Sequence, residues 1–401
     1  MNQILVELIS TATIAIALFG VAFSLMQTHY RHVNRSFAAF LACVACNNVP
    51  DALSRMLDMM QGSFVQSVSL ALWLCSALCL APTLWIYVYT LTSNAQRWPK
   101  SLGRHLILPV LGAVVGAALI ISPDETRASF FSETSLPTEG WALAVLASIA
   151  VLQVALYPQL AFYLYLIVRR LVQYKRKLRD VYASTEQHEL RWIYVIGGLG
   201  GLFWVAQSLI LAAAINPNWA FVPMAMLSLF GLALFAATTL WGLRQRPPLV
   251  PDVGEDAVGP ASTSSPKYEN SALSTEASAR IARKLRAAME VDHLHRDPNL
   301  SLWALARHTG GSPNYISQTL NEIIGESFFD FVNGYRVAEA MKLLATTDQT
   351  VLSITYDVGF NARSSFYNAF KRVTGQTPSQ YRKTMSVREG MDDVDSVVRH
   401  T

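Results

Sequence analysis

The 401-residue sequence predicts an all-α protein, in which a bundle of seven transmembrane helices precedes a soluble helical domain with two helix-turn-helix units. Apolar residues make up 52% of the chain and charged residues 15%, whereas soluble domains have about 45–50% and about 25%. The apolar excess lies in the first 242 residues. The last third instead repeats a pattern of helix, glycine turn and helix.

Seven apolar runs have roughly the length of the ~20-residue helix that crosses a bilayer. They cover residues 4–26, 36–57, 70–92, 105–122, 141–168, 192–215 and 219–241. Run ends carry tryptophans, which favour the headgroup level, at positions Trp141, Trp192, Trp219 and Trp241. The first run lacks the basic start and the cleavage site of a signal peptide. We therefore expect residues 1–242 to form a transmembrane domain that retains its first helix.

Basic residues between the runs predict the orientation of this bundle. When seven helices are threaded, the loops on one side contain Arg31, Arg35, Arg97, Lys100, Arg104, Arg169, Arg170, Lys175, Arg176, Lys177, Arg179, Arg191, Arg244 and Arg246. The opposite loops hold only Arg127, among acidic residues. Because cytoplasmic loops of membrane proteins are rich in Lys and Arg, we expect the N-terminus outside and the C-terminal domain in the cytoplasm.

The second run is the least apolar and holds candidate sensing residues. Asn47, Asp51 and Arg55 share one helix face, and Glu7 lies at a similar depth in the first run. Ionisable groups inside a membrane are costly and face the bundle interior or a water-filled cavity. Asp51 and Arg55 are spaced so that they could pair. Two interpretations stay open: a structural ion pair that locks the first two helices, or a pocket for an unknown small molecule, open to the outside.

Cysteine and histidine patterns do not predict a metal site or a cofactor. The four cysteines lie in predicted membrane helices without a histidine nearby, which favours ordinary packing for Cys43, Cys46, Cys75 and Cys79. Lone histidines of the C-terminal domain are expected at the surface, namely His293, His295 and His308.

A linker is predicted between the two regions. Residues 243–275 are rich in Pro, Ser, Ala and Asp and lack periodic hydrophobic residues. A flexible chain of this length has a root-mean-square span of roughly 30 Å, so it transmits no rigid motion. The helical domain then occupies residues 276–385, and the polar tail, residues 386–401, is expected to be disordered.

The first helix-turn-helix unit begins at Ser301, which can cap a helix. Ala306 is small where two helices must cross closely, and Gly310 can adopt the left-handed conformation of the turn. Ser312 and Pro313 then fit the start of the second helix. This spacing is typical of a helix-turn-helix.

The second unit repeats the spacing, with Gly359 four residues after the crossing residue Thr355. Its second helix is expected over residues 361–372, and Gly375 ends it. Between the units, a helix over residues 327–345 would be about 28 Å long at 1.5 Å per residue. That length is close to the ~34 Å between successive major-groove faces of B-DNA.

Residues 277–383 resemble the DNA-binding domain of the AraC/XylS transcription regulators. The resemblance is carried by Gly359, Phe360, Phe366, Phe370, Lys371, Gly375, Pro378, Tyr381 and Arg382, and upstream by Ser312, Gly325, Phe328, Arg336 and Ala340. Four positions depart from the family, which usually has alanine at Thr355 and often basic or aromatic residues at Gln318, Leu320 and Asn321. The helical spacing of Phe360, Phe366, Phe370 and Tyr381 predicts core packing.

The resemblance implies a sequence-specific DNA-binding transcription regulator, and the apolar runs place it in a bacterial inner membrane. We expect promoter DNA, RNA polymerase and the lipid bilayer as its partners. No nucleotide loop or nucleophile constellation is present in the sequence, so we do not expect an enzyme. Base contacts would come from Asn314, Ser317, Gln318, Arg363, Ser364 and Asn368, and phosphate contacts from Lys371 and Arg372. From Glu276 to Lys383 there are 13 Lys and Arg against 10 Asp and Glu, a net charge of +3. This low charge implies moderate affinity or homodimerisation. The alternative is a membrane receptor or transporter whose helical C-terminal domain binds protein partners.

Overall fold

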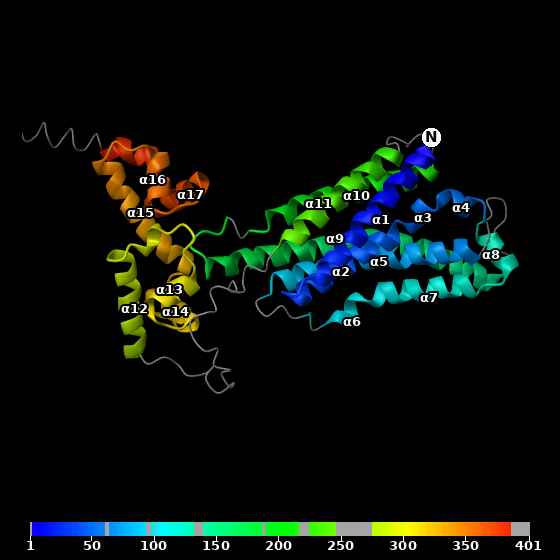
Figure 1. The fold of residues 1–401 in the computed structure, drawn as a ribbon, viewed down its shortest axis with the longest axis horizontal. Helices are drawn as coiled ribbons and strands as arrows, with labels where there is room; N and C mark the ends of the chain where they lie inside the picture. Colours follow the sequence, from blue (N-terminus) through cyan, green and yellow to red (C-terminus); the bar gives the residue numbers. More distant parts are fainter. Residues whose placement is uncertain are drawn as a thin grey trace, which may run out of the picture. The chain divides into compact units, whose positions relative to one another are not determined.

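The computed structural model describes residues 2–60, 64–93, 98–99, 101–131, 139–186, 189–215, 224–245 and 275–385. Within these ranges the secondary structure is helical apart from one isolated β-bridge, so the all-α prediction is confirmed (Figure 1). The chain divides into two compact units. The N-terminal unit comprises Met1–Val172 with Leu190–Pro248, and the C-terminal unit comprises Gln173–Glu189 with Leu249–Thr401.

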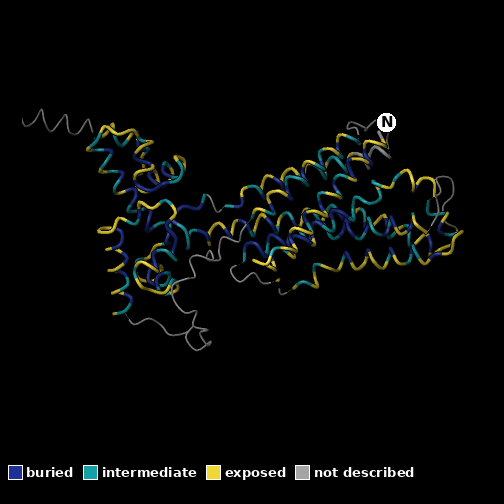
Figure 2. The backbone as a smooth tube through the Cα atoms, in the orientation of Figure 1, coloured by how far each residue is buried: buried dark blue, intermediate teal, exposed yellow. Residues whose placement is uncertain are grey.

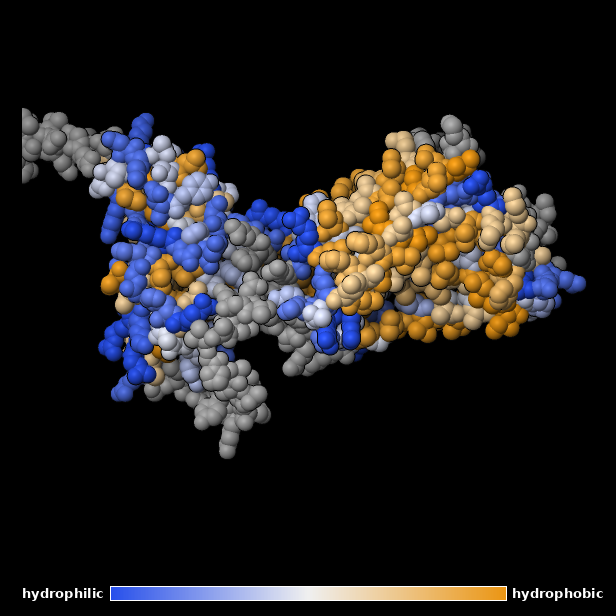
Figure 3. Space-filling model, in the orientation of Figure 1, coloured by the Kyte–Doolittle hydropathy of each residue, from blue (hydrophilic) through white to orange (hydrophobic). Residues whose placement is uncertain are grey.

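Long apolar helices build the N-terminal unit. Helix α1 packs against α2 and α11, and α5 packs against α2 and α7. Hydrophobic residues cover the visible face of this unit (Figure 3), and α7 is exposed along much of its length (Figure 2). The helices are α1 (Asn2–Met26), α2 (Arg31–Asn47), α3 (Val49–Ala52), α4 (Ser54–Asp58), α5 (Phe64–Leu91), α6 (Leu102–His105), α7 (Ile107–Ile121), α8 (Asp124–Phe130), α9 (Gly140–Arg179), α10 (Arg191–Ile215) and α11 (Met224–Arg244).

Five helices of the described residues are long and apolar enough to cross a membrane, namely α1, α5, α9, α10 and α11. Helix α7 is apolar but has 15 residues. The second apolar run is not one helix, because α2 ends at Asn47 and the short helices α3 and α4 follow. Pro50 lies in the first turn of α3 and has no N–H to continue the hydrogen bonding of α2.

The helices of the C-terminal unit surround two hydrophobic cores. Helix α15 joins them, because Phe331 and Val332 pack in the first core and Val337 and Leu344 in the second. The helices are α12 (Thr275–Glu290), α13 (Leu302–Thr309), α14 (Pro313–Thr319), α15 (Phe328–Thr346), α16 (Val351–Asp357) and α17 (Arg363–Thr374), with a 3-10 turn at Leu294–Arg296 and a π-helical turn at Leu320–Ile324. Most of the predicted linker, residues 246–274, and the tail, residues 386–401, lie outside the described residues.

Candidate nucleic-acid interface

The first motif consists of α13 and α14. The hydroxyl of Ser301 accepts a hydrogen bond from the backbone N–H of Ala304 at 3.1 Å, so it caps α13 as predicted. Gly310 has a φ of 65° and ends α13 in the left-handed conformation. Ala306 is buried at the crossing. Ser312 stands before α14 but makes no side-chain cap, so Pro313 with its fixed φ begins this helix.

The second motif, α16 and α17, has the same turn under a tighter constraint. Gly359 has a φ of 96°, and a Cβ atom there would lie 2.5 Å from the carbonyl oxygen of His295. Only glycine fits without displacing backbone. Thr355, which replaces the usual alanine, is fully buried and donates its hydroxyl to the carbonyl of Val351 at 2.7 Å. The departure therefore leaves no unsatisfied polar group at the crossing.

Aromatic residues of the second motif form its core, as the helical spacing predicts. Phe366 and Phe370 are fully buried and Phe360 is nearly so. Their rings pack edge to face at 5.3 Å and 5.5 Å, and Tyr381 packs against Phe370. These side chains fix the orientation of α17 and are not available to stack on bases.

The second helix of the first motif, α14, and the second helix of the second motif, α17, expose different polar residues. On α17, Arg363, Ser364 and Asn368 are exposed within the first two turns. The guanidinium of Arg363 donates to the hydroxyl of Tyr367 at 3.1 Å, and this hydrogen bond lowers the pKa of Tyr367. Lys371 is exposed further along the helix.

On α14, Asn314 is exposed but Ser317 and Gln318 are half-buried. Gln318 donates its amide to the carboxylate of Glu322 at 2.9 Å. The sequence-based prediction missed Glu322, although its spacing of four residues from Gln318 could have revealed it. The first motif therefore has fewer free hydrogen-bond donors than the sequence predicted, and Glu322 adds a negative charge beside them.

Comparison with known proteins assigns the domain. Residues 305–384 match the family described as "Helix-turn-helix domain". The C-terminal domain is a helix-turn-helix domain of the AraC type. An uncharacterized HTH-type transcriptional regulator of Staphylococcus aureus (strain COL) is 35% identical over 99 residues, which are 25% of this chain and 13% of that protein.

Two further proteins are similar to this domain. The HTH-type transcriptional regulator YtdP of Bacillus subtilis (strain 168) is 32% identical over 95 residues, which are 24% of this chain and 12% of that protein. A solved structure, the C-terminal domain of the response regulator AraT from Geobacillus stearothermophilus, is 28% identical and covers 26% of this chain and 84% of that chain, with a TM-score of 0.24. The chain thus matches about an eighth of the length of these S. aureus and B. subtilis relatives.

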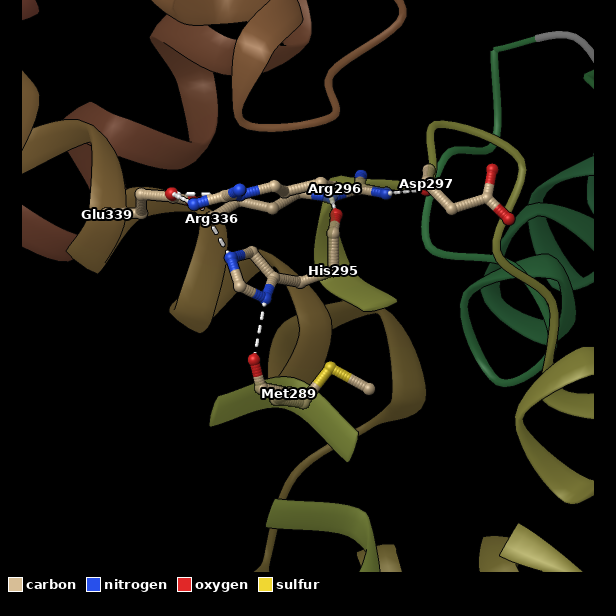
Figure 4. Close-up of polar contacts among 6 residues, drawn as sticks. All are labelled: Met289, His295, Arg296, Asp297, Arg336 and Glu339. Atoms are coloured by element: carbon tan, nitrogen blue, oxygen red, sulfur yellow. Dashed lines mark hydrogen bonds and ion pairs between the residues drawn. The ribbon is translucent and has the colours of Figure 1, made fainter. Parts of the chain in front are cut away.

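A buried polar network ties the two motifs of the AraC-type domain together (Figure 4). Arg336 of α15 is fully buried and donates to the carbonyls of His295 and Asp297, both at 2.7 Å. Its guanidinium also lies over the ring of Phe360, 5.3 Å from the centroid. Burial lowers the pKa of Arg336 to about 10, so it stays charged at neutral pH. Arg336 therefore contacts both the backbone that precedes α13 and the core of the second motif, and in this way it connects the two motifs.

His295 is buried, so its prediction as a surface residue was wrong. One ring nitrogen lies 3.0 Å from the carbonyl of Met289 and the other 2.7 Å from the carboxylate of Glu339 (Figure 4). Both polar atoms are satisfied inside the fold, which makes burial tolerable. Glu339 also accepts from Arg296 at 2.9 Å. Against the opposing effect of burial, the hydrogen bonds from Arg296 and His295 lower the pKa of Glu339.

Arg55 pairs with Glu7 of the first apolar run, and not with Asp51, the partner that its four-residue spacing had suggested. The guanidinium Nε donates to Glu7 at 2.6 Å, and Glu7 also accepts from the backbone N–H of Arg55 at 3.0 Å. The prediction failed because Asp51 and Arg55 stand on separate helices, α3 and α4, so their four-residue spacing does not place them on one face. The ion pair still joins the first and second apolar runs, through α1 and α4.

A cavity of about 330 Å³ with both polar and apolar lining residues lies in the N-terminal unit. Asn47 and Asp51 line it, so half of the candidate sensing residues meet here. Within the described part of the chain, Asp51 has no hydrogen-bond or ion-pair partner, and no Lys or Arg lines the cavity. The remaining polar and aromatic lining includes Trp73, Gln153, Tyr157, Trp204 and Gln207.

Proposed function

We propose that the chain is a membrane-embedded, sequence-specific DNA-binding transcription regulator that responds to a signal at the membrane. The observation that carries this proposal is an AraC-type domain with exposed Arg363, Ser364 and Asn368 on a second helix, in one chain with five helices of membrane-spanning length. Promoter DNA is the main partner, and RNA polymerase is a second one.

In the proposed topology the protein crosses the membrane seven times, with α2–α4 and α7 as the two additional spans. The N-terminus lies outside and the AraC-type domain lies in the cytoplasm of a bacterium. The distribution of basic residues between the apolar runs supports this orientation. It also places the domain where DNA is.

The proposed assembly is a homodimer on DNA. A net charge of +3 over the helical domain neutralises few phosphates. Gln318 and Glu322 further weaken the first motif, because they pair with each other. Two copies on paired half-sites would supply the missing affinity.

The proposed sensing site is the cavity around Asp51. An unpaired carboxylate in one cavity with Trp73, Tyr157 and Trp204 fits a small organic cation, because aromatic rings attract cations and an unpaired charge at membrane depth is costly. Asn47 would bind the same molecule. Glu7 and Arg55 would position α1 against α4 and would not contact it.

This site can be tested with benzyltrimethylammonium and with the neutral benzyl alcohol as probes. The cation should raise the melting temperature of the full chain in detergent, by mass action on the folded state. Asp51→Asn should abolish the rise, while the matched variant Asp58→Asn should keep it. An equal rise in both variants, or with both probes, would refute the site.

The DNA-binding proposal is tested by selection from a random DNA library with the full chain in lipid vesicles. We expect enrichment of a site with two half-sites about 10 base pairs apart. A variant with Arg363, Ser364 and Asn368 all changed to alanine should bind DNA without enriching any sequence. Failure of the parent protein to enrich a sequence would favour the alternative, a receptor whose C-terminal domain binds proteins.

A further inference from the structure

A segment that follows α9 is part of the C-terminal unit. Residues 181–185, here called the strap, run antiparallel to the residues that precede α13. The backbone N–H of Ala183 donates to the carbonyl of Leu300 at 3.1 Å, and the N–H of Leu302 donates to the carbonyl of Val181 at 2.8 Å. These two bonds flank the directly opposed residues Tyr182 and Ser301.

Most residues of the strap are buried to the same extent as core residues of the domain. Ala183 is 1% exposed and packs with Leu300, Leu302 and Phe331 in the first hydrophobic core. Ser184 and Thr185 are also buried. The ring of Tyr182 packs edge to face on Trp303 of α13 at 5.8 Å. Removing the strap would therefore expose part of the core of the AraC-type domain.

The strap also supplies acceptors to the network that joins the two motifs. The carbonyl of Ala183 accepts from the amide of Asn333 at 3.1 Å, and the hydroxyl of Ser184 accepts from Arg336 at 3.1 Å. Arg336 is the residue that contacts His295, Asp297 and Phe360. If the strap were displaced, the buried guanidinium of Arg336 would lose two of its hydrogen-bond acceptors. Arg336 is also the residue that connects the two motifs.

The end of α9 forms a second attachment just before the strap. The guanidinium of Arg179 pairs with Asp330 of α15 at 2.9 Å and lies over the ring of Phe329, 4.7 Å from its centroid. Asp330 also pairs with Arg372, one of the predicted phosphate contacts, at 2.8 Å. Docking of α9 therefore influences a charge on the predicted DNA-binding face.

We propose that the strap is the control element of the AraC-type domain: docked, it completes the domain and fixes the two motifs for DNA, and undocked, it weakens binding. The proposal rests on the proposed function. It identifies α9 as the route of the signal, because this helix carries Gln153 and Tyr157 of the cavity and ends at Arg179. The predicted linker has no periodic hydrophobic residues that could provide such a connection.

Docking is tested with a disulfide in the full chain in lipid vesicles. Opposed residues of this type have Cα atoms about 4.5 Å apart, within the disulfide range of about 4.4–6.8 Å. In a parent with Cys43, Cys46, Cys75 and Cys79 changed to alanine, the pair Tyr182→Cys with Ser301→Cys should close nearly completely under mild oxidation. The control pair Tyr182→Cys with Ser353→Cys, on α16, should not. Equal yields would overturn docking.

Control is tested with charge reversal at Arg179, whose side chain is 36% exposed and therefore tolerant of substitution. Arg179→Glu should slow closure of the 182–301 disulfide and lower the affinity for the selected DNA site by roughly ten-fold, the effect of ~1.4 kcal/mol. Arg176→Glu makes the same charge change at an exposed position and should alter neither the rate of disulfide closure nor the affinity for DNA. Closing the disulfide in Arg179→Glu should restore the affinity to within about two-fold of the parent value.

Two outcomes would overturn control by the strap: equal losses in Arg179→Glu and Arg176→Glu, or no recovery on closing the disulfide. If the parent protein binds no specific DNA, the proposed function fails. The disulfide yield still decides whether the strap docks, so the two failures are distinguishable.

Discussion

The two motifs of the AraC-type domain share a turn but differ in what surrounds it. In the first motif the turn is open, since a Cβ at Gly310 would meet nothing within 4 Å, whereas the turn of the second motif contacts backbone at His295. Gln318 of α14 is paired with Glu322 of the π-helical turn that follows, while α17 exposes Arg363 and Lys371. Ala183 of the strap packs in the core of the first motif, and within the described residues the core of the second motif contains no strap residue. The difference agrees with the two proposals made above, in which the first motif is the one that the strap controls and the second motif reads the DNA sequence.

Replacing Arg336, the buried cation between the two motifs, should have the largest effect on the free energy of unfolding. Arg336→Met leaves the buried carbonyl of His295 without a donor and removes a donor from the side chain of Asn333, at a cost of about 1–3 kcal/mol for each, while the carbonyl of Asp297 keeps its bond from the N–H of Leu300 at 3.3 Å. We expect the free energy of unfolding to fall by roughly 3 kcal/mol or more. Chemical denaturation measures it, with the exposed Arg307→Met as control. Equal stability of the two variants would mean that Arg336 does not join the motifs.

The two turn glycines allow a matched comparison. Gly310→Ala should cost about 1 kcal/mol, because only the left-handed backbone is strained. Gly359→Ala adds a backbone collision at 2.5 Å to the same strain and should cost more than about 3 kcal/mol. Thermal unfolding of both variants measures the difference. A smaller loss for Gly359→Ala would show that the second turn is as open as the first.

Lys371 should act on affinity without acting on sequence choice. Lys371→Ala removes one predicted phosphate contact, so it should weaken binding to all DNA sequences alike and reduce the salt dependence of log K by about one. Titrations with specific and unrelated DNA at several salt concentrations test this role. A selective loss for the specific site would instead assign Lys371 to base reading.

The smallest effect concerns acid stability. The pKa of Glu339 is lowered in the folded state, so its contribution to stability is present above the unfolded pKa of about 4.3 and is lost as pH falls through the folded pKa. Glu339→Gln should lose less stability than the parent protein below about pH 4.3. Denaturation at pH 3.5–6 compares them, and parallel curves would contradict the assignment.

The turns and cores of the motifs could be predicted from local sequence. In each motif a glycine four residues after the small crossing residue predicts a left-handed turn, and Gly310 and Gly359 both have a positive φ. The helix predicted at 327–345 is observed at Phe328–Thr346. Buried Phe366 and Phe370 follow from helical spacing alone.

Contacts between distant segments could not be predicted in this way. Ala183 contacts Leu300 across more than a hundred residues, and a short stretch without periodicity gives no sign of burial. Arg55 lies near Asp51 in sequence, yet a break between α3 and α4 directs it to Glu7. His295 is buried because Met289 and Glu339 supply hydrogen-bond partners, and the sequence around His295 gives no indication of them.

The central claim is that the chain reads DNA chiefly through the second motif. Affinities of the full chain in lipid vesicles, for the selected site and for unrelated DNA, test it with Arg363→Ala and Gln318→Ala. Arg363→Ala should lose about 1–3 kcal/mol of specific binding and relax the choice at one base pair, because arginine reads a guanine edge. Gln318→Ala should lose less, since Glu322 already holds its amide. The claim is contradicted if Gln318→Ala loses more, or if Arg363→Ala weakens specific and unrelated DNA equally.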